Sequence, residues 1–200
     1  IIDVPNGRRI SFGELDARVR RLANALTSLS GVGKGARIAI LAKNCIEYLE
    51  LFYACGRAGL IAQPLNWRLA VPEMARIVLE GEPAAVLTSA DFRAERDALQ
   101  SLVDVPHWLE FGAAADGSYE DLLAGASDAE PAGSERNGGD DPLLILYTGG
   151  TTGESKGALH SHRSIYMGML NQTVAERIVP SDVYMLTGQM YHIPLLLARN

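Results

Sequence analysis

Short apolar segments alternate with amphipathic segments along the first half of the chain, and this alternation restricts the fold more than any other feature. Apolar runs rich in Ile, Val, Leu and Ala predict strands over residues 37–41, 60–64 and 84–88. The segments between them carry helical periodicity. Strands that alternate with helices form parallel sheets, because each crossover helix returns the chain to the same end of the sheet. The sequence therefore predicts an α/β fold built from parallel-sheet layers.

Capping residues mark where the predicted helices begin. Ser11 and Glu14 have the spacing of a capping box, and apolar residues at intervals of three and four extend this helix to about residue 30. Three further helix starts are expected at Asn44, Pro72 and Asp91, with the helices from Pro72 and Asp91 ending near residues 80 and 102.

The second half of the chain begins with a change in composition. Residues 112–141 are rich in Gly, Ala, Asp and Glu, with one helical turn at 119–123, and we expect a surface connection. We divide the chain near Gly139, into a first α/β lobe over 1–139 and the start of a second lobe over 140–200. The second part is predicted to hold a strand at 143–148, a helix at 163–177 and a last strand at 182–187.

Composition and charge exclude several classes of protein. The chain has 200 residues, and its 18 Lys and Arg against 24 Asp and Glu give a net charge of −6, which does not attract a nucleic-acid backbone. No apolar run approaches the roughly 18 residues of a transmembrane helix. Cys45 and Cys55 lie on different faces of one predicted helix, so we expect core thiols of a cytoplasmic protein. His160 and His162 lack a third ligand at metal-binding spacing, so no metal site is predicted there.

A segment rich in Gly, Thr and Ser follows the strand at 143–148 and contains Lys156. Glycines allow successive backbone N–H groups to turn toward an anion, hydroxyl groups add donors, and the ammonium group adds a compact positive charge. This combination predicts a polyphosphate-binding loop. The segment is not a Walker loop, because Gly is missing at the required position and Lys156 is followed by Gly157.

The same segment also matches a nucleophile elbow. Gly153, Ser155 and Gly157 have the required spacing, and Asp182 and His192 follow in the order of the α/β-hydrolase triad. An elbow needs the Ser on a tight turn directly after a strand, whereas four Gly and Thr residues separate Thr148 from Gly153. A hydrolase that uses Ser155 therefore remains an alternative hypothesis.

The string YTGGTTGESKGALHSH at 147–162 resembles the phosphate-loop signature of the adenylate-forming enzymes, which include acyl-CoA synthetases, peptide-synthetase adenylation domains and luciferases. Weaker similarity over 10–15, 32–40 and 58–66 follows the family's order. The resemblance implies the parallel-sheet N-terminal domain of this family, in incomplete form. Gly149 stands where the family usually has Ser, and Ser155 stands where it usually has Pro. We expect these two changes to weaken nucleotide binding and to leave the chemistry intact.

The resemblance implies that ATP and a carboxylic acid form an acyl-adenylate, after which the acyl group passes to coenzyme A. Mg²⁺ would assist the departure of pyrophosphate. Lys156 and Thr152 would take part in catalysis. The residues that would hold the β- and γ-phosphates are Thr148, Gly149, Gly150, Thr151, Thr152, Gly153 and Lys156.

The resemblance also places Tyr191 and His192 in the pocket for the acid. Members that activate amino acids usually carry an Asp there for the substrate ammonium, a charge that neutral His192 does not supply. A fatty or aromatic acid is therefore expected, with an amino-acid adenylation domain as the alternative. The chain begins without Met and the family's C-terminal lid is absent, so we expect a fragment that is inactive alone. Whether the protein forms a homodimer is left open.

Overall fold

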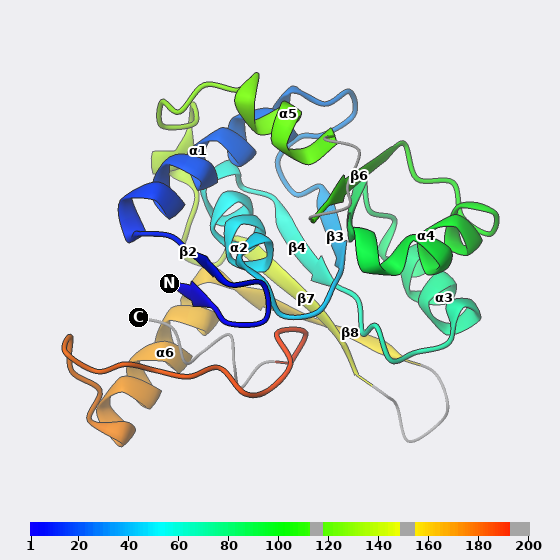
Figure 1. Ribbon diagram of the computed structural model, residues 1–200. Helices are drawn as coiled ribbons and strands as arrows, with labels where there is room; N and C mark the ends of the chain where they lie inside the picture. The colour runs from blue at the N-terminus through cyan, green and yellow to red at the C-terminus, as the bar shows by residue number, and fades with distance from the viewer. Residues whose placement is uncertain (113–117, 149–154, 193–200) are drawn as a thin grey trace.

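The computed structural model describes residues 1–112, 118–148 and 155–192, and its elements are labelled in Figure 1. The strands are β1 (Ile2–Asp3), β2 (Arg8–Arg9), β3 (Arg37–Leu41), β4 (Ile61–Pro64), β5 (Ala85–Ser89), β6 (His107–Phe111), β7 (Pro142–Thr148) and β8 (Lys156–Ser161). The helices are α1 (Phe12–Ser28), α2 (Ile46–Ala58), α3 (Val71–Gly81), α4 (Arg93–Gln100), α5 (Ser118–Ala124) and α6 (His162–Glu176), with 3-10 turns η1 (Ala90–Phe92) and η2 (Ser134–Arg136).

Within the described residues, six strands form one sheet in the order β6-β5-β3-β4-β7-β8. Neighbouring strands are parallel except for β8, which runs antiparallel to β7. The α/β fold with a mainly parallel sheet is therefore confirmed. The short strands β1 and β2 pair with each other in a separate antiparallel hairpin.

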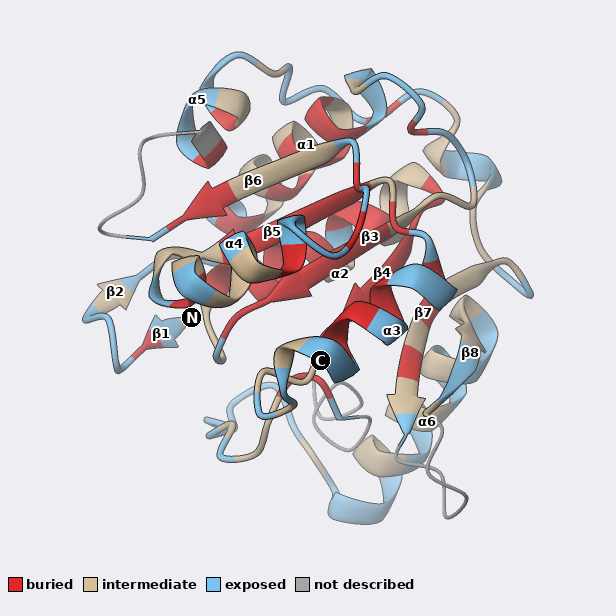
Figure 2. Cartoon of the chain, turned by 90° about the vertical axis from the view of Figure 1, so that its right-hand side faces the viewer, coloured by how far each residue is buried: buried red, intermediate tan, exposed pale blue. Residues whose placement is uncertain are grey.

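Helices cover both faces of the sheet. Because successive side chains of a strand point to opposite faces, each strand contacts the helices on both sides. Ile38 and Ile40 of β3 pack with α1, α2 and α5 on one face, while Ala39 and Leu41 pack with α3 and α4 on the other. α6 contacts the first face through Ile165. Figure 2 shows β3, β4 and β5 as the buried centre of this arrangement. The fold thus has three layers.

Several predicted boundaries are confirmed by the structure. The capping box at the start of α1 forms as expected, with Glu14 N donating to Ser11 Oγ at 3.1 Å and Ser11 N donating to Glu14 Oε2 at 2.7 Å. β3 has the predicted bounds. The end of α2 was not predicted: its C-cap is Gly59, whose φ of 67° lies in the left-handed region that glycine adopts without strain.

Two predicted helix caps are wrong. Asn44 does not cap α2, because the N-cap is Cys45 and the Asn44 amide bonds to residues near the end of the described chain. Asp91 does not cap a helix either. Instead its backbone N–H donates to the Oγ of Ser89, which caps η1. In both cases another residue or a distant contact outcompetes the local capping signal.

In the second half of the chain, the strand predicted at 143–148 is confirmed as β7 and the helix predicted at 163–177 as α6, but other strand predictions are wrong. β6 and β8 were not predicted, whereas the predicted strand at 182–187 does not form and its Val183 is 95% exposed. β7 lies beside β4, with Leu144 opposite Ala62, so residues on both sides of position 139 contribute to one sheet. The division of the chain into two lobes stays a prediction. No helix in the described ranges has both the length and the apolar character to cross a membrane.

Candidate functional site

The predicted phosphate-binding segment lies between two paired strands. Thr148 ends β7 and Lys156 begins β8, and the two residues are opposite each other in the antiparallel register. Both side chains are exposed. Five predicted ligand residues lie outside the described residues: Gly149, Gly150, Thr151, Thr152 and Gly153. Of the predicted set, the structure therefore describes Thr148 and Lys156, at the two ends of the segment.

The residues next to this segment fit an anion better than a catalytic serine. In the described part of the chain, Lys156 takes part in no ion pair, so its ammonium group is available to a ligand. Ser155 is half-buried and leads into strand β8. A nucleophile elbow requires a helix directly after the serine, so the local structure does not fit the hydrolase motif.

Gly157, next to Lys156, leaves space for side chains of the neighbouring strand β7. A Cβ atom at this position would lie 2.9 Å from Cδ1 of Ile145 and 3.2 Å from Cζ of Tyr147, closer than normal packing allows. Tyr147 packs against the core on the α3 and α4 face. The absence of a side chain at Gly157 thus allows these two β7 side chains to cross over β8.

The carboxyl ends of the parallel strands meet along one edge of the sheet, the edge at which open α/β sheets bind ligands. Thr148 ends β7 there, Lys43 and Asn44 follow β3, and Trp67 and Arg68 follow β4. Lys43 Nζ and Arg68 Cζ lie 6.0 and 5.1 Å from the centre of the Trp67 ring. Cations therefore follow two of the central strands at this edge.

The two predicted acid-pocket residues lie at the end of the described chain. Tyr191 is 6% exposed, whereas His192 is exposed, and their ring centres are 4.7 Å apart. Burial raises the pKa of Tyr48 in α2 well above its ordinary value, and Cys45 and Tyr191 raise it further.

The segment that carries Tyr191 and His192 is attached to the carboxyl edge of the sheet by side chains that the sequence did not point to. Asn44 Nδ2 donates to the Gly188 carbonyl at 2.6 Å, and Met190 N donates to Asn44 Oδ1 at 2.9 Å. Trp67 Nε1 donates to Gln189 Oε1 at 3.1 Å. The only sequence signal for Asn44 was misleading, because Asn is a residue type that commonly caps helices.

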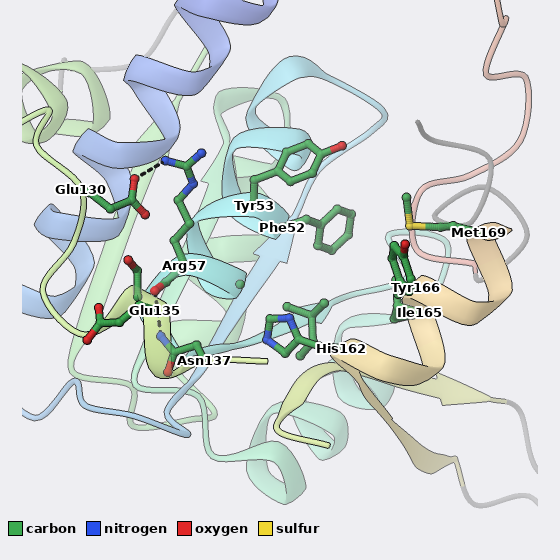
Figure 3. Close-up of a pocket in the computed structure, with 13 residues that line it drawn as sticks. Phe52, Tyr53, Arg57, Glu130, Glu135, Asn137, His162, Ile165, Tyr166 and Met169 are labelled. Carbon is green, nitrogen blue, oxygen red and sulfur yellow. Dashed lines mark hydrogen bonds and ion pairs between the residues drawn. The ribbon is translucent and has the colours of Figure 1, made fainter. Parts of the chain in front are cut away.

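A separate hollow of about 460 Å³ lies between α2 and α6 (Figure 3). Phe52, Tyr53, His162 and Tyr166 contribute to its wall. The wall also includes Arg57 and Glu130, which form an ion pair at 2.8 Å. His162 Nε2 is buried and has no hydrogen-bond partner among the described residues. This hollow contains none of the predicted phosphate-binding or acid-pocket residues, and its position gives His162 a packing role beside Gly56.

The free thiols follow the expectation from sequence in part. Cys55 is fully buried, and burial raises its pKa, so the thiol stays protonated and packs as an apolar group. Cys45 is half-buried at the N-cap of α2. Neither thiol forms a disulfide in the described part of the chain.

Comparison with known proteins decides the family. The model of the AMP-binding enzyme family matches residues 1–197. The chain belongs to the AMP-binding enzyme family. This AMP-binding chain is 35% identical over 188 residues to the long-chain-fatty-acid–CoA ligase FadD13 of Mycobacterium tuberculosis, covering 94% of the chain and 37% of FadD13. It is equally identical, at 35% over 188 residues, to the indoleacetate–CoA ligase of Aromatoleum aromaticum, covering 93% of the chain and 36% of that relative.

A solved structure with a nucleotide has the same fold. ATP-bound MatB from Rhodopseudomonas palustris superposes with a TM-score of 0.82 at 34% sequence identity, covering 96% of this chain and 37% of MatB. The AMP-binding chain thus spans little more than a third of the length of these proteins. The expected family is confirmed, and its relatives include CoA ligases for a fatty and an aromatic acid.

The described residues fit a nucleotide polyphosphate. Lys156 offers an exposed ammonium group, Thr148 offers a hydroxyl, and Lys43 and Arg68 add positive charge near the same sheet edge. No group of three His, Cys, Asp or Glu side chains that could hold a metal ion occurs in the ranges the structure describes. Mg²⁺ is commonly bound through substrate phosphates with few protein ligands.

Proposed function

We propose that the protein containing this chain activates a carboxylic acid with ATP. The acid carboxylate attacks the α-phosphorus, pyrophosphate leaves, and the resulting acyl-adenylate transfers its acyl group to the thiol of coenzyme A with release of AMP. The observation that carries the proposal is the position of Thr148 and Lys156 opposite each other on β7 and β8, at the two ends of a Gly- and Thr-rich segment in an AMP-binding enzyme. Because the chain spans 37% of FadD13, the proposal concerns the longer protein.

Charge repulsion is the main obstacle to this reaction, since a carboxylate must approach a triphosphate. Lys156 opposes that repulsion: a charge pair at about 4 Å is worth on the order of 4 kcal/mol at an effective dielectric constant near 20, before desolvation. Thr148 donates its hydroxyl to a phosphate oxygen, and Gly149, Gly150, Thr151, Thr152 and Gly153 supply further N–H and hydroxyl donors. Bound Mg²⁺ would neutralise the developing charge on pyrophosphate.

The acid is proposed to be fatty or aromatic. Residues 188–192 contain no Asp or Glu, so this segment offers no carboxylate to a substrate ammonium group. Buried Tyr191 presents aromatic surface beside exposed His192. The names of FadD13 and the indoleacetate ligase agree with this class of acid. The buried free thiol of Cys55 supports a reducing compartment, and we place the reaction in the cytoplasm.

Acid-dependent exchange of pyrophosphate into ATP tests the proposal. The longest natural chain containing this sequence is assayed with fatty, aromatic and amino acids. We expect exchange with fatty or aromatic acids, and Lys156→Ala lowers kcat/KM for ATP about 10- to 100-fold through loss of a charged hydrogen bond. Exchange with amino acids alone would identify an amino-acid adenylation domain. No exchange with any acid would overturn the proposal.

Lys34→Ala is the matched control for Lys156→Ala. Lys34 is also an exposed lysine, but it lies before β3 at the amino edge of the sheet and pairs with Asp141 at 3.0 Å. Its removal leaves kcat/KM for ATP unchanged. The 200-residue chain alone is expected to form no acyl-adenylate, and detection of that product would show that this part of the protein suffices for the first half-reaction.

A further inference from the structure

The side chain of Asn44 makes a two-way contact with a backbone segment far along the sequence. Its amide nitrogen donates to the carbonyl of Gly188 at 2.6 Å, and its amide oxygen accepts the N–H of Met190 at 2.9 Å. Both donor and acceptor of one carboxamide are therefore used on residues 144 and 146 positions away. A carboxamide with both functions engaged fixes the orientation as well as the position of the backbone it contacts.

The neighbouring loop adds a second attachment at the same place. Trp67, in the loop between β4 and α3, donates to the Gln189 side chain at 3.1 Å, and its ring packs 6.1 Å from the ring of Phe92. Gly188, Gln189 and Met190 are thus bonded by side chains from two adjacent loops. In Figure 1 the end of the described chain passes beneath the loop that joins β3 to α2, as these contacts require.

The attached residues directly precede the predicted acid-pocket residues. Met190 is 2% exposed and packs in the core with α1 and α2, and the N–H of His192 donates to the Gln189 carbonyl at 3.0 Å in a turn. Tyr191 and His192 therefore belong to a turn that these contacts hold in place. The orientation of their side chains depends on the position of that turn. Asn44 lies three residues after the end of β3, a central strand with partners on both sides, so its loop starts from the middle of the sheet.

We infer that Asn44 is a positioning residue for the acid pocket, acting through Gly188 and Met190 on Tyr191 and His192, with Trp67 as its supporting contact. This inference rests on the proposed function, because Tyr191 and His192 are assigned to the acid by that proposal. Asn44 itself does not touch the acid. Its loss is expected to weaken and broaden selection of the acid while leaving the binding of ATP at Lys156 unaffected.

The test compares Asn44→Ala with Asn24→Ala in the longest natural chain. Asn24 is a matched control, because its amide also bonds a remote backbone segment, at the carbonyls of Ser127 and Ala129, each at 2.9 Å. That segment lies beside α1, away from residues 188–192. Both variants lose the same side-chain group and comparable hydrogen bonds, so a general loss of stability affects them alike.

Two measurements are made on each variant. Hydrogen exchange of the backbone amides of residues 188–192 reports the contact itself, since Met190 N–H loses its acceptor in Asn44→Ala and exchanges faster. Pyrophosphate exchange reports the consequence: we expect the KM for the acid to rise about tenfold, from two lost hydrogen bonds, with the KM for ATP unchanged. Trp67→Phe, which keeps the ring and removes the Nε1 donor, raises the KM for the acid about threefold.

The outcomes separate this inference from the proposed function. If the parent protein exchanges pyrophosphate but Asn44→Ala leaves the KM for the acid unchanged, or raises the KM for acid and ATP equally, the positioning role is overturned. If Asn24→Ala shifts the KM for the acid as much as Asn44→Ala does, the role is likewise overturned. If the parent shows no exchange with any acid, the proposed function fails first and the inference fails with it. Trp67→Phe decides the question should Asn44→Ala not fold.

Discussion

Arg18 of α1 donates from Nε to the buried carboxylate of Glu50 in α2, with 2.5 Å between Nε and Oε1. Glu50 is 0% exposed, and the hydroxyl of Tyr119 in α5 donates to the same carboxylate. The Arg18 guanidinium also bonds Glu120, at 2.7 Å between Nη2 and Oε1. One charged cluster therefore joins three helices on one face of the sheet.

Removal of Arg18 is expected to destabilise the protein strongly. Arg18→Ala leaves the buried Glu50 carboxylate without its cation, and breaking such a pair typically lowers the free energy of unfolding by about 3 to 5 kcal/mol. Arg21→Ala is the control on the same helix, since Arg21 contacts exposed Asp128 at 3.5 Å and contributes less than about 1 kcal/mol. Urea unfolding of both variants checks the difference, and equal losses would contradict it.

Low pH is expected to destabilise the protein through protonation of Glu110. Hydrogen bonds from Arg93, with further attraction from Arg96, hold the pKa of Glu110 below its ordinary value of 4.5. At pH values near 4.5 and below, Glu110 therefore binds a proton more readily in the unfolded chain than in the folded chain. The free energy of unfolding decreases as the pH falls below about 4.5. Urea unfolding at about pH 6 and about pH 4 should show a smaller decline in Glu110→Gln than in the parent. Glu135→Gln, at an exposed carboxylate, should decline as the parent does.

A side chain at Gly157 is expected to destabilise the protein. In Gly157→Ala the new Cβ meets Ile145 at 2.9 Å, so the side chains over β8 must shift, at a cost of about 1 to 3 kcal/mol. A Cβ at Gly33 has no atom within 4 Å, and Gly33→Ala should leave stability unchanged or raise it slightly. Thermal unfolding distinguishes the two variants. A Gly157→Ala protein as stable as Gly33→Ala would contradict the prediction, because it would show that the Ile145 and Tyr147 side chains move aside at no cost.

Restoring the family's usual serine should strengthen ATP binding. Gly149 lacks the hydroxyl that a serine would donate to a phosphate, a hydrogen bond to a charged group worth roughly 1.5 to 3 kcal/mol. Gly149→Ser in the longest natural chain is expected to lower the KM for ATP about tenfold and to leave the KM for the acid unchanged. An unchanged KM for ATP would mean that other donors already replace the hydroxyl.

Local sequence signals were sufficient to predict elements whose pattern is complete within a few consecutive residues. The capping box of Ser11 and Glu14 needs only one helical turn, and the apolar run of β3 is buried on both faces, so its residues read as a strand in isolation. β6 was missed because His107, Trp108 and Glu110 interrupt its apolar pattern, and its parallel pairing with β5 depends on residues distant in sequence.

For the candidate site, the sequence indicated which residue types gather there but not the strands that flank them, and the phosphate-binding roles stay predictions. The Gly, Thr and Lys residues identified the segment, but β8 was read as part of the loop, because exposed Lys156, Gly157 and Ala158 carry no strand pattern of their own. Asn44 was read as a helix cap, because its partners lie 144 and 146 positions away and the local sequence gives no sign of them. Val183 and Tyr184 suggested a strand that has no pairing partner in the described structure.

The antiparallel β8 strand has a consequence for the entropy of ligand binding. A segment that joins a strand to a distant helix must bring its own ends together when it wraps around an anion, and that loop closure opposes binding. Here the pairing of Thr148 with Lys156 already holds together the ends of the seven residues 149–155. The closure entropy is therefore lost when the sheet folds and does not oppose the later binding of the ligand.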